Sequence, residues 1–458
     1  MKYKDLISNL NDFGDNAVIF EKDQEYSYKD LFNQVDDYYH QLLENNVSSS
    51  KTIVLLSDYS FQYISLLLAL YQNGNIIVPI TTKIDREKDM MISQVPVDYS
   101  IDISADNKLN ILVNSIPHEI DSQKIELLNT FKEREKSGLV LFSSGISGKP
   151  KSMLHDFESL AVVKNNQRKK SLRFILFLLF DHIGGINTML HILNSGGAMV
   201  LTENRDPSHI AGLIEKHQVN VLPTTPTFLN LFLLSDILEK FNLRSLRLIT
   251  YGTEPMPESL LIRLKKKFKF VKFLQTFGTS ETGVFNVINK ANSTSIKIDD
   301  SIVEYKIVDS ELWIRSKTQI LGYLNHNQAN FTEDGWFKTG DMVEEQEDGY
   351  MKIMGRFNEV INVGGQKVLP VEVESVLIKN ENISNCRVYG AQNDITGQMV
   401  MAEVVLNTDK GLSKGEVRKE LKQVCHDSLE EFKIPVKFKF VDDIKMNRRF
   451  KKEKVIQS

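Results

Sequence analysis

The sequence predicts an α/β protein with a large N-terminal domain of helix-covered, mostly parallel sheets, a β subdomain, and a small α+β C-terminal domain. Short apolar runs alternate with helical patterns over the first two-thirds of the chain, and this alternation favours parallel strands covered by helices. Residues 302–323 have the pattern of antiparallel strands. About a hundred residues follow a linker that contains Gly355, enough for a separate domain.

The expected elements follow from these patterns in chain order. Apolar runs expected to form strands of the large domain are 53–56, 76–80, 139–142, 174–180, 198–201, 219–222 and 246–249, with a helix over 65–71. Residues 311–315 are expected to form a strand of the β subdomain. The linker is expected at 355–358, which divides the chain into domains 1–354 and 355–458. The small domain is expected to have helices over 372–378 and 414–432 and strands over 387–389 and 401–406.

Composition narrows the class of protein. The 458 residues are 41% hydrophobic and 25% charged, as in ordinary globular proteins. The net charge of -4 argues against general nucleic-acid affinity, and basic clusters such as 265–267 are interpreted as solvated faces. Cys386 and Cys425 lie far apart in sequence and fit a reduced cytoplasmic protein better than a disulfide scaffold or a zinc site. The start of the chain is too polar for a signal peptide, and the apolar runs are too short to span a bilayer, so we expect no transmembrane segment.

The loop at residues 143–151 follows the predicted strand 139–142 and combines two glycines, three serines and two lysines. Exposed N–H groups and cations suit a bound polyphosphate. The loop is not a Walker A motif, because Gly145 and Gly148 are separated by two residues and Pro150 follows Lys149. For this segment alone, an ordinary glycine–serine turn is the alternative.

This loop resembles the signature loop of the adenylate-forming enzymes, the superfamily of acyl-CoA synthetases, peptide-synthetase adenylation domains and luciferases. Segments 277–283, 335–341, 355–374 and 441–451 resemble four further family motifs in the same order. The resemblance implies that the chain uses ATP and Mg²⁺ to convert a carboxylic acid into an acyl-adenylate. It then implies transfer of the acyl group to a thiol, either CoA or the phosphopantetheine of a separate carrier protein. It also implies that the small domain moves about a hinge.

The resemblance assigns roles to particular residues. Phe277 would offer an aromatic face to adenine, Asp341 would accept hydrogen bonds from both ribose hydroxyls, and Glu281 would bind Mg²⁺. In isolation, Asp341 could belong to a Gly-Asp turn and Glu281 could be a surface carboxylate. The full predicted nucleotide set is Ser143, Ser144, Gly145, Ser147, Gly148, Lys151, Gly252, Thr253, Glu254, Phe277, Gly278, Thr279, Asp341 and Arg356. Ser280 is expected to meet the α-phosphate.

The predicted catalytic residues are Lys451, Ser280 and Glu281. Lys451 is expected to serve adenylation, because a flexible cation there could stabilise charge that builds on the carboxylate and the α-phosphate. The alternative is a solvated basic tail. The resemblance places the hinge at Asn358 and a pantetheine channel at Gly364 and Gly365.

Asp181 and His182 align with a segment that borders the acid pocket in the family. Asp181 could also hold the ammonium group of an amino-acid substrate, and a strand-end aspartate beside a core histidine is a further alternative. The sequence does not identify the acid.

Ser280 and Phe277 stand where the family usually has Thr and Tyr and keep the hydroxyl and the aromatic ring. Three further positions depart from the family pattern more strongly: Ile146 replaces a loop threonine, Phe450 replaces a glycine, and Asn358 lacks the usual hinge charge. A degenerate, non-catalytic AMP-binding relative is therefore one alternative function. An amino-acid-activating ligase that loads a separate carrier protein is another, and a luciferase-like oxygenase is a third. We expect an acid–thiol ligase, because Glu281, Asp341, Arg356 and a lysine are all present.

Overall fold

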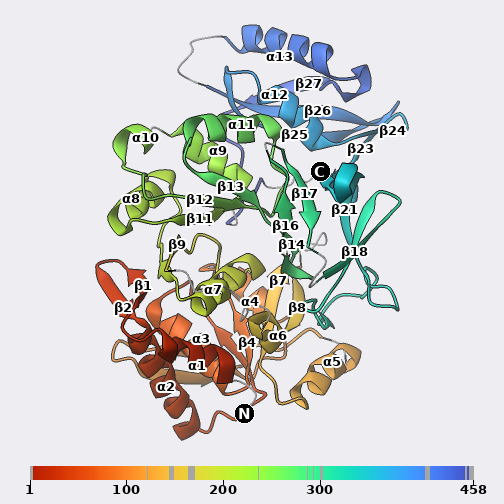
Figure 1. Cartoon of the computed structure of the whole chain (residues 1–458). Coiled ribbons are helices and arrows are strands. Elements are labelled where there is room, and N and C mark those ends of the chain that lie inside the picture. Colours follow the sequence, from red (N-terminus) through yellow and green to blue (C-terminus); the bar gives the residue numbers. More distant parts are fainter. Residues whose placement is uncertain are drawn as a thin grey trace.

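The computed structural model describes residues 4–120, 122–143, 149–162, 171–235, 237–285, 287–291, 293–299, 303–407, 413–448 and 451–452. Ser144, Gly145, Ile146, Ser147 and Gly148 of the predicted phosphate loop, and Phe450, lie outside these ranges. Figure 1 shows a large domain below and a small C-terminal domain above it.

Two sheets of seven described strands each form most of the large domain. In the first, all neighbours are parallel except β1 and β2. Its order is β13 (Lys272–Gln275), β12 (Leu248–Tyr251), β11 (Val221–Thr224), β9 (Arg173–Ile175), β10 (Ala198–Val200), β1 (Ala17–Glu21) and β2 (Gln24–Ser27). The second sheet has a parallel centre, and its order is β20 (Gly322–Tyr323), β8 (Lys151–Asp156), β7 (Gly138–Ser143), β4 (Ile76–Pro79), β3 (Thr52–Leu55), β5 (Tyr99–Ile103) and β6 (Leu109–Val113).

Helices cover both faces of these sheets, as the alternation in the sequence predicts. Strand β3 shows the reason: Ile53 and Leu55 enter one core, whereas Val54 enters the core on the opposite face. The shared core contains α1 (Lys4–Asp12), α2 (Tyr28–Glu44), α3 (Phe61–Gln72), α6 (Phe157–Val162) and α7 (Ile183–Ser195). The outer faces carry α4 (Asp85–Ile92) and α5 (Ser122–Lys132) on one side and α8 (Pro207–His217), α9 (Pro226–Leu234), α10 (Ile237–Lys240) and α11 (Glu258–Lys267) on the other.

An antiparallel β subdomain follows. The strands β14 (Phe277–Thr279) and β15 (Gly283–Phe285) form a hairpin. The adjoining sheet has the order β16 (Val287–Asn289), β17 (Ser295–Ile298), β22 (Met351–Arg356), β21 (Phe337–Glu345), β19 (Glu311–Ser316) and β18 (Val303–Val308), and the short helix η1 spans Glu347–Gly349.

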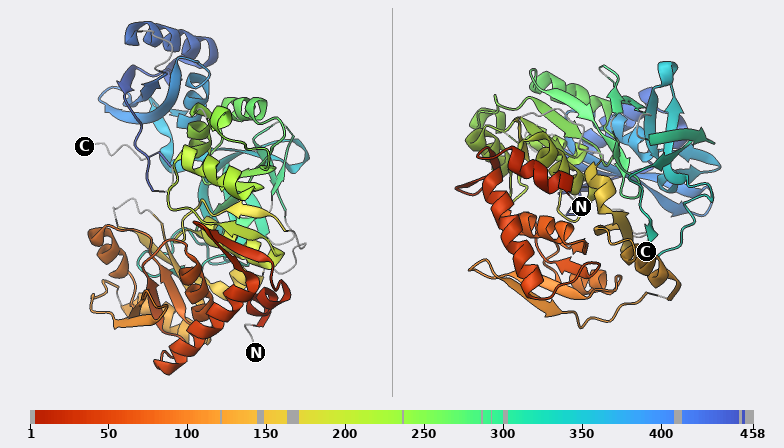
Figure 2. Two further views of the ribbon diagram at one scale, coloured as in Figure 1. Left: turned by 90° about the vertical axis from the view of Figure 1, so that its left-hand side faces the viewer. Right: turned by 60° about the horizontal axis from the view of Figure 1, so that its bottom comes forward.

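The small domain begins after the short helix η2 (Phe357–Glu359) and has its own core, which includes Val373, Leu377 and Leu421. The left view of Figure 2 shows it as a separate lobe above the large domain. Its elements are β23 (Ile361–Val363), β24 (Gln366–Val368), α12 (Pro370–Leu377), β25 (Ile383–Asn393), β26 (Gly397–Leu406), α13 (Lys414–Ser428), η4 (Glu431–Lys433) and β27 (Lys437–Val441).

The predicted fold class is confirmed, and three element bounds need correction. The strand expected over 174–180 ends at Ile175, because the chain leaves the sheet to reach α7 while Phe177 and Phe180 stay buried; an apolar run reports burial rather than strand structure. The helix expected over 414–432 ends at Ser428, since Leu429 is extended. The predicted linker overlaps β22, which continues to Arg356. None of the helices in the described ranges has the length and apolar character needed to cross a bilayer.

Candidate active site

A cavity of about 1860 Å³ lies where the large domain, the β subdomain and the small domain meet. The carboxyl ends of the parallel strands β11, β12 and β13 open into it, and β21, β22 and the adjoining residues 357–361 form another wall. Ligands of open α/β sheets commonly bind at such strand ends. The predicted site residues found in its lining are Ser143, Lys151, His182, Gly252, Thr253, Glu254, Phe277, Gly278, Thr279, Ser280, Glu281, Asp341, Arg356, Asn358 and Lys451.

Asp341 and Arg356 form an ion pair at the edge of this cavity. Nε of Arg356 donates to Oδ1 of Asp341 at 3.0 Å. The aspartate side chain is 9% exposed, whereas the arginine is 50% exposed. Burial raises the pKa of Asp341, and the positive charge of Arg356 opposes that rise. The pair therefore presents a carboxylate acceptor and a cation side by side, a suitable arrangement for ribose hydroxyls and an adjacent phosphate.

Glu281 is oriented by a residue that the sequence did not single out. The hydroxyl of Tyr323 donates to Oε1 of Glu281 at 2.9 Å, and Lys151 lies over the Tyr323 ring with Nζ 5.4 Å from its centroid. Tyr323 is buried and pairs with Met153 across β20 and β8. Because β20 and β8 meet only in the folded sheet, nothing local in the sequence indicates that Tyr323 supports this site.

The surroundings of Glu281 fit a magnesium ion that arrives with a nucleotide. No cluster of three His, Cys, Asp or Glu side chains suited to a metal occurs within the described ranges. Magnesium is usually held by one or two carboxylates together with phosphate oxygens and water, rather than by an all-protein cage. Glu281, with Oε1 fixed by Tyr323, would be such a single carboxylate ligand, and the ion would supply charge neutralisation at the phosphates.

The β14–β15 hairpin places Phe277, Thr279 and Ser280 along one wall. Gly278 has a φ of +155°, and a Cβ there would lie 2.2 Å from the carbonyl oxygen of Gly283. Glycine is therefore required for this tight hairpin. The hydroxyls of Thr279 and Thr282 lie 2.9 Å apart and close the turn.

Glu254 faces the same cavity from the loop after β12. It accepts a hydrogen bond from the Thr227 backbone N–H at 2.7 Å. Burial raises the pKa of Glu254, whereas the Thr227 hydrogen bonds and the charges of Lys452 and Lys451 oppose the rise.

Lys451 reaches the cavity from the end of the small domain. Met446 and Lys452 pair as an antiparallel bridge, and the Asn447 N–H donates to the Lys451 carbonyl at 2.9 Å. We call residues 445–448 and 451–452 the Lys451 segment. Lys452 anchors its base, because Nζ lies 2.7 Å from Oε2 of Glu374 on α12. This arrangement brings the predicted lysine and the predicted nucleotide residues to one cavity.

Three predicted residues stand apart from the cavity lining. Gly364 and Gly365 form the turn between β23 and β24, with φ values of +56° and +86°, and neither belongs to the described lining. Asp181 is 4% exposed, and its Oδ2 accepts the hydroxyl hydrogen of Thr81 at 2.7 Å. His182 does line the cavity, and its Nδ1 caps α7 by accepting the Gly184 N–H at 3.1 Å.

A crevice extends from this cavity between α7 and the first sheet. In β12, Ile249 and Tyr251 enter the outer core, whereas Leu248 and Thr250 are half-buried and line the crevice. The facing side of α7 contributes residues from Gly184 to Ser195, a helical length of about 16 Å. The residues that α7 and the strands β9, β11, β12 and β13 contribute to the cavity lining are apolar or polar without a carboxylate, lysine or arginine, whereas the same cavity is lined elsewhere by charged side chains such as Lys151, Glu254 and Glu281; the first group includes Phe174, Gly184, Asn187, Thr188, His191, Ser195, Val221, Leu248, Thr250 and Leu274.

The fold and the site together define an adenylate-forming ligase of the acyl-CoA synthetase type. A model of the AMP-binding enzyme family matches residues 8–324, and a model of the AMP-binding enzyme C-terminal domain matches residues 372–451. The chain therefore belongs to the AMP-binding enzyme family, which confirms the resemblance found in the sequence.

Individual relatives agree with this assignment. The chain is 24% identical over 461 residues to a 2-succinylbenzoate–CoA ligase of Bacillus pumilus, with 94% of this chain and 92% of the relative covered. A 2-succinylbenzoate–CoA ligase of Bacillus subtilis is 25% identical over 463 residues, with coverage of 94% and 92%. The fold is similar to that of an anthranilate CoA ligase in complex with anthranoyl-AMP, with a TM-score of 0.83, 19% identity, and coverage of 99% of this chain and 96% of that chain.

Proposed function

We propose that this enzyme uses ATP to convert a carboxylic acid into an acyl-adenylate and then transfers the acyl group to the thiol of CoA. The observation that carries the proposal is the convergence of Glu281, the Asp341–Arg356 pair and Lys451 on one cavity. Attack of a carboxylate on the α-phosphate brings two anions together, so charge neutralisation and positioning supply most of the catalysis. Lys451 would contribute a cation at the reacting oxygens, and Ser280 would offer a hydroxyl to the α-phosphate.

One observation supports CoA as the acceptor, and a second supports the cytoplasm as the location. The relatives that cover most of this chain are named CoA ligases. Cys386 and Cys425 are both unpaired and buried, as expected in a reducing compartment. The alternative acceptor is a separate carrier protein. Acyl transfer to the pantetheine thiol of a carrier protein, but not to CoA, would favour that alternative.

The crevice favours an acid with an uncharged, mainly apolar body. Leu172, Phe174 and Leu248 supply apolar walls, and His191 and Ser195 supply polar groups from α7. None of the lining residues contributed by α7, β9, β11, β12 and β13 is a carboxylate that could pair with a substrate ammonium, and Oδ2 of Asp181 is already bonded to Thr81.

The test is ATP–pyrophosphate exchange with a panel of aryl, fatty, amino and dicarboxylic acids, followed by mass spectrometry of products with CoA. We expect exchange with aromatic or medium-chain monocarboxylic acids, loss of exchange when EDTA removes Mg²⁺, and an acyl-CoA product. ATP binding without exchange for any acid would favour the non-catalytic alternative. Exchange confined to amino acids would favour the carrier-loading alternative, and light or CO₂ from an adenylate in oxygen would favour the oxygenase.

A further inference from the structure

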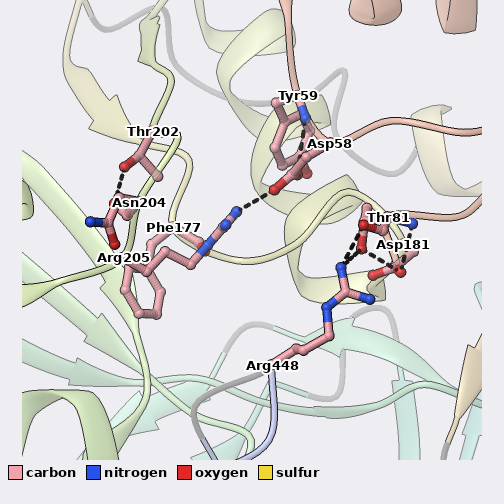
Figure 3. A network of polar contacts seen from close by, with 9 residues as sticks. All are labelled: Asp58, Tyr59, Thr81, Phe177, Asp181, Thr202, Asn204, Arg205 and Arg448. Atoms are coloured by element: carbon pink, nitrogen blue, oxygen red, sulfur yellow. Dashed lines mark hydrogen bonds and ion pairs between the residues drawn. The ribbon is translucent and has the colours of Figure 1, made fainter. Parts of the chain in front are cut away.

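Arg448 crosses from the small domain to the large domain. Its Nη2 donates to the backbone oxygen of Thr81 at 2.6 Å and to Oγ1 of the same threonine at 2.9 Å. Thr81 lies just beyond the carboxyl end of β4, in the large domain, and is 5% exposed. Figure 3 shows the arginine side chain reaching this threonine from the Lys451 segment.

Thr81 is prepared to receive this arginine by Asp181. The threonine hydroxyl has one hydrogen, and it donates that hydrogen to Oδ2 of Asp181 at 2.7 Å. The Thr81 N–H donates to the same oxygen at 3.2 Å. Oγ1 of Thr81 therefore turns its lone pairs toward Arg448, and the hydrogen bonds run in one direction from the guanidinium through the hydroxyl to the carboxylate.

The charges also favour this arrangement. Asp181 is 4% exposed, and its Oδ1 has no hydrogen-bond partner among the described residues. A buried carboxylate is unfavourable unless hydrogen bonds and a nearby cation compensate. Arg205, the other arginine in Figure 3, donates from Nη2 to Oδ2 of Asp58 at 2.9 Å and from Nε to the Phe177 carbonyl, so it does not compensate Asp181. Arg448 brings its positive charge to the threonine that holds Asp181.

The two anchors of the Lys451 segment differ in kind. Lys452 and Glu374 belong to the same domain, so a rotation of the small domain would leave their ion pair intact. Arg448 and Thr81 belong to different domains, so their contact requires the orientation seen here. Lys451 lies between the two anchors in sequence, and it lines the cavity in this orientation.

We propose that Arg448 is a positioning residue for the adenylation step: its interdomain contact with Thr81 and Asp181 holds the small domain in the orientation that delivers Lys451. This inference rests on the proposed function for the step it serves. The contact must break when the small domain rotates for thiol transfer, so it contributes to the first half-reaction and not to the second.

The kinetic test compares Arg448→Met with Lys445→Met, a matched removal of an exposed cation from the same segment. We expect Arg448→Met to slow ATP–pyrophosphate exchange by roughly tenfold to a hundredfold, as for lost hydrogen bonds to a charged group. Thioester formation from synthetic acyl-adenylate should keep its wild-type rate. Thr81→Val should slow the exchange less than Arg448→Met does, because the backbone acceptor of Arg448 remains. In the double variant the two effects should not add. Arg448→Lys should recover part of the loss.

A structural test does not depend on turnover. Cysteines are introduced at Glu239 and Lys419, which are exposed positions on α10 and α13, and each carries a spin label. Double electron–electron resonance spectroscopy then measures the distance between the two domains. We expect the distance found in this structure to be populated in the wild type and Lys445→Met proteins and depleted in Arg448→Met. Identical distributions in all three would overturn the proposal, as would equal slowing of both half-reactions. If no acid supports exchange, the proposed function fails, and the label distances still decide whether Arg448 holds this orientation.

Discussion

Asp341 and Arg356 are cross-strand partners in the ladder of β21 and β22, and their side chains form an ion pair at 3.0 Å. Arg356 is the last residue of β22, and η2 with Asn358, the predicted hinge residue, follows at once. Asp341, whose carboxylate is predicted to bind the ribose, is therefore paired with Arg356, the last strand residue before the chain enters the small domain. The predicted nucleotide contacts and the predicted hinge therefore lie at one strand end.

Removal of Arg356 should change the pH dependence of ATP use. Burial raises the pKa of Asp341, and Arg356 opposes the rise, so Arg356→Met should raise that pKa further. Only the ionised carboxylate accepts from two hydroxyls, so ATP binding weakens as the pH falls through the pKa. We expect the acid limb of kcat/KM for ATP to move to higher pH and the KM to rise about tenfold. Arg356→Lys keeps the charge and should move the acid limb less; an unchanged limb in Arg356→Met would contradict the assignment.

Lys451→Ala should abolish most adenylate formation. Loss of a cation that stabilises transition-state charge costs roughly 10²-fold or more. The measurement is pyrophosphate exchange at saturating ATP and acid, with thioester formation from supplied acyl-adenylate as the control reaction. The control should remain near the wild-type rate, and exchange at the wild-type rate in Lys451→Ala would refute the assignment.

Gly365→Trp should spare adenylation and block thioester formation. A Cβ at Gly365 meets no atom within 4 Å in this orientation, so the large side chain has room while the nucleotide site is assembled. After rotation, the predicted pantetheine channel would receive the indole. The φ of +86° adds strain of about 1–2 kcal/mol for a non-glycine residue. Gly365→Asn controls for that strain, since asparagine tolerates the left-handed backbone conformation. Equal loss of both half-reactions in Gly365→Trp would count against the two-orientation scheme.

Leu248→Trp should shorten the crevice. Leu248 begins β12 and therefore lies deeper than Thr250, which is closer to the strand end that faces the nucleotide site. We expect the KM for long or two-ring acids to rise at least tenfold, the scale for loss of a fitted apolar group of several carbons. Short acids such as acetate or propionate, where accepted at all, should keep their KM. A uniform change across the panel would mean that the acyl group binds elsewhere.

His155→Leu should reduce the loss of stability in acid. Burial lowers the pKa of His155 to about 3, and neither ring nitrogen has a partner among the described residues. An unfolded histidine binds a proton below about pH 6.5, so the unfolded state takes up the proton first and stability falls as the pH drops from there toward 3. The slope contributed is up to about 1.4 kcal/mol per pH unit. Urea unfolding at several pH values should show this slope in the wild type and in His40→Leu, an exposed histidine, but not in His155→Leu.

Local sequence determined most of the strand and helix order of this protein, because apolar periodicity is a property of neighbouring residues. It also determined family membership, since the five motif segments are each short and contiguous. Ser280, Glu281, Asp341 and Lys451 could be named from those segments before any fold was known. The limits of the local signal appear at 174–180, where a buried run continues as a loop instead of a strand.

Only the tertiary structure decided which distant side chains support those residues. Tyr323 orients Glu281 because β20 is added to β8, and Thr81 meets Arg448 because the two domains close on each other. The crevice beside α7 exists because one face of β12 is left partly uncovered while the other face is packed. These contacts depend on how sheets and domains approach each other, which is set by packing among elements far apart in the chain and has no periodic trace in the sequence.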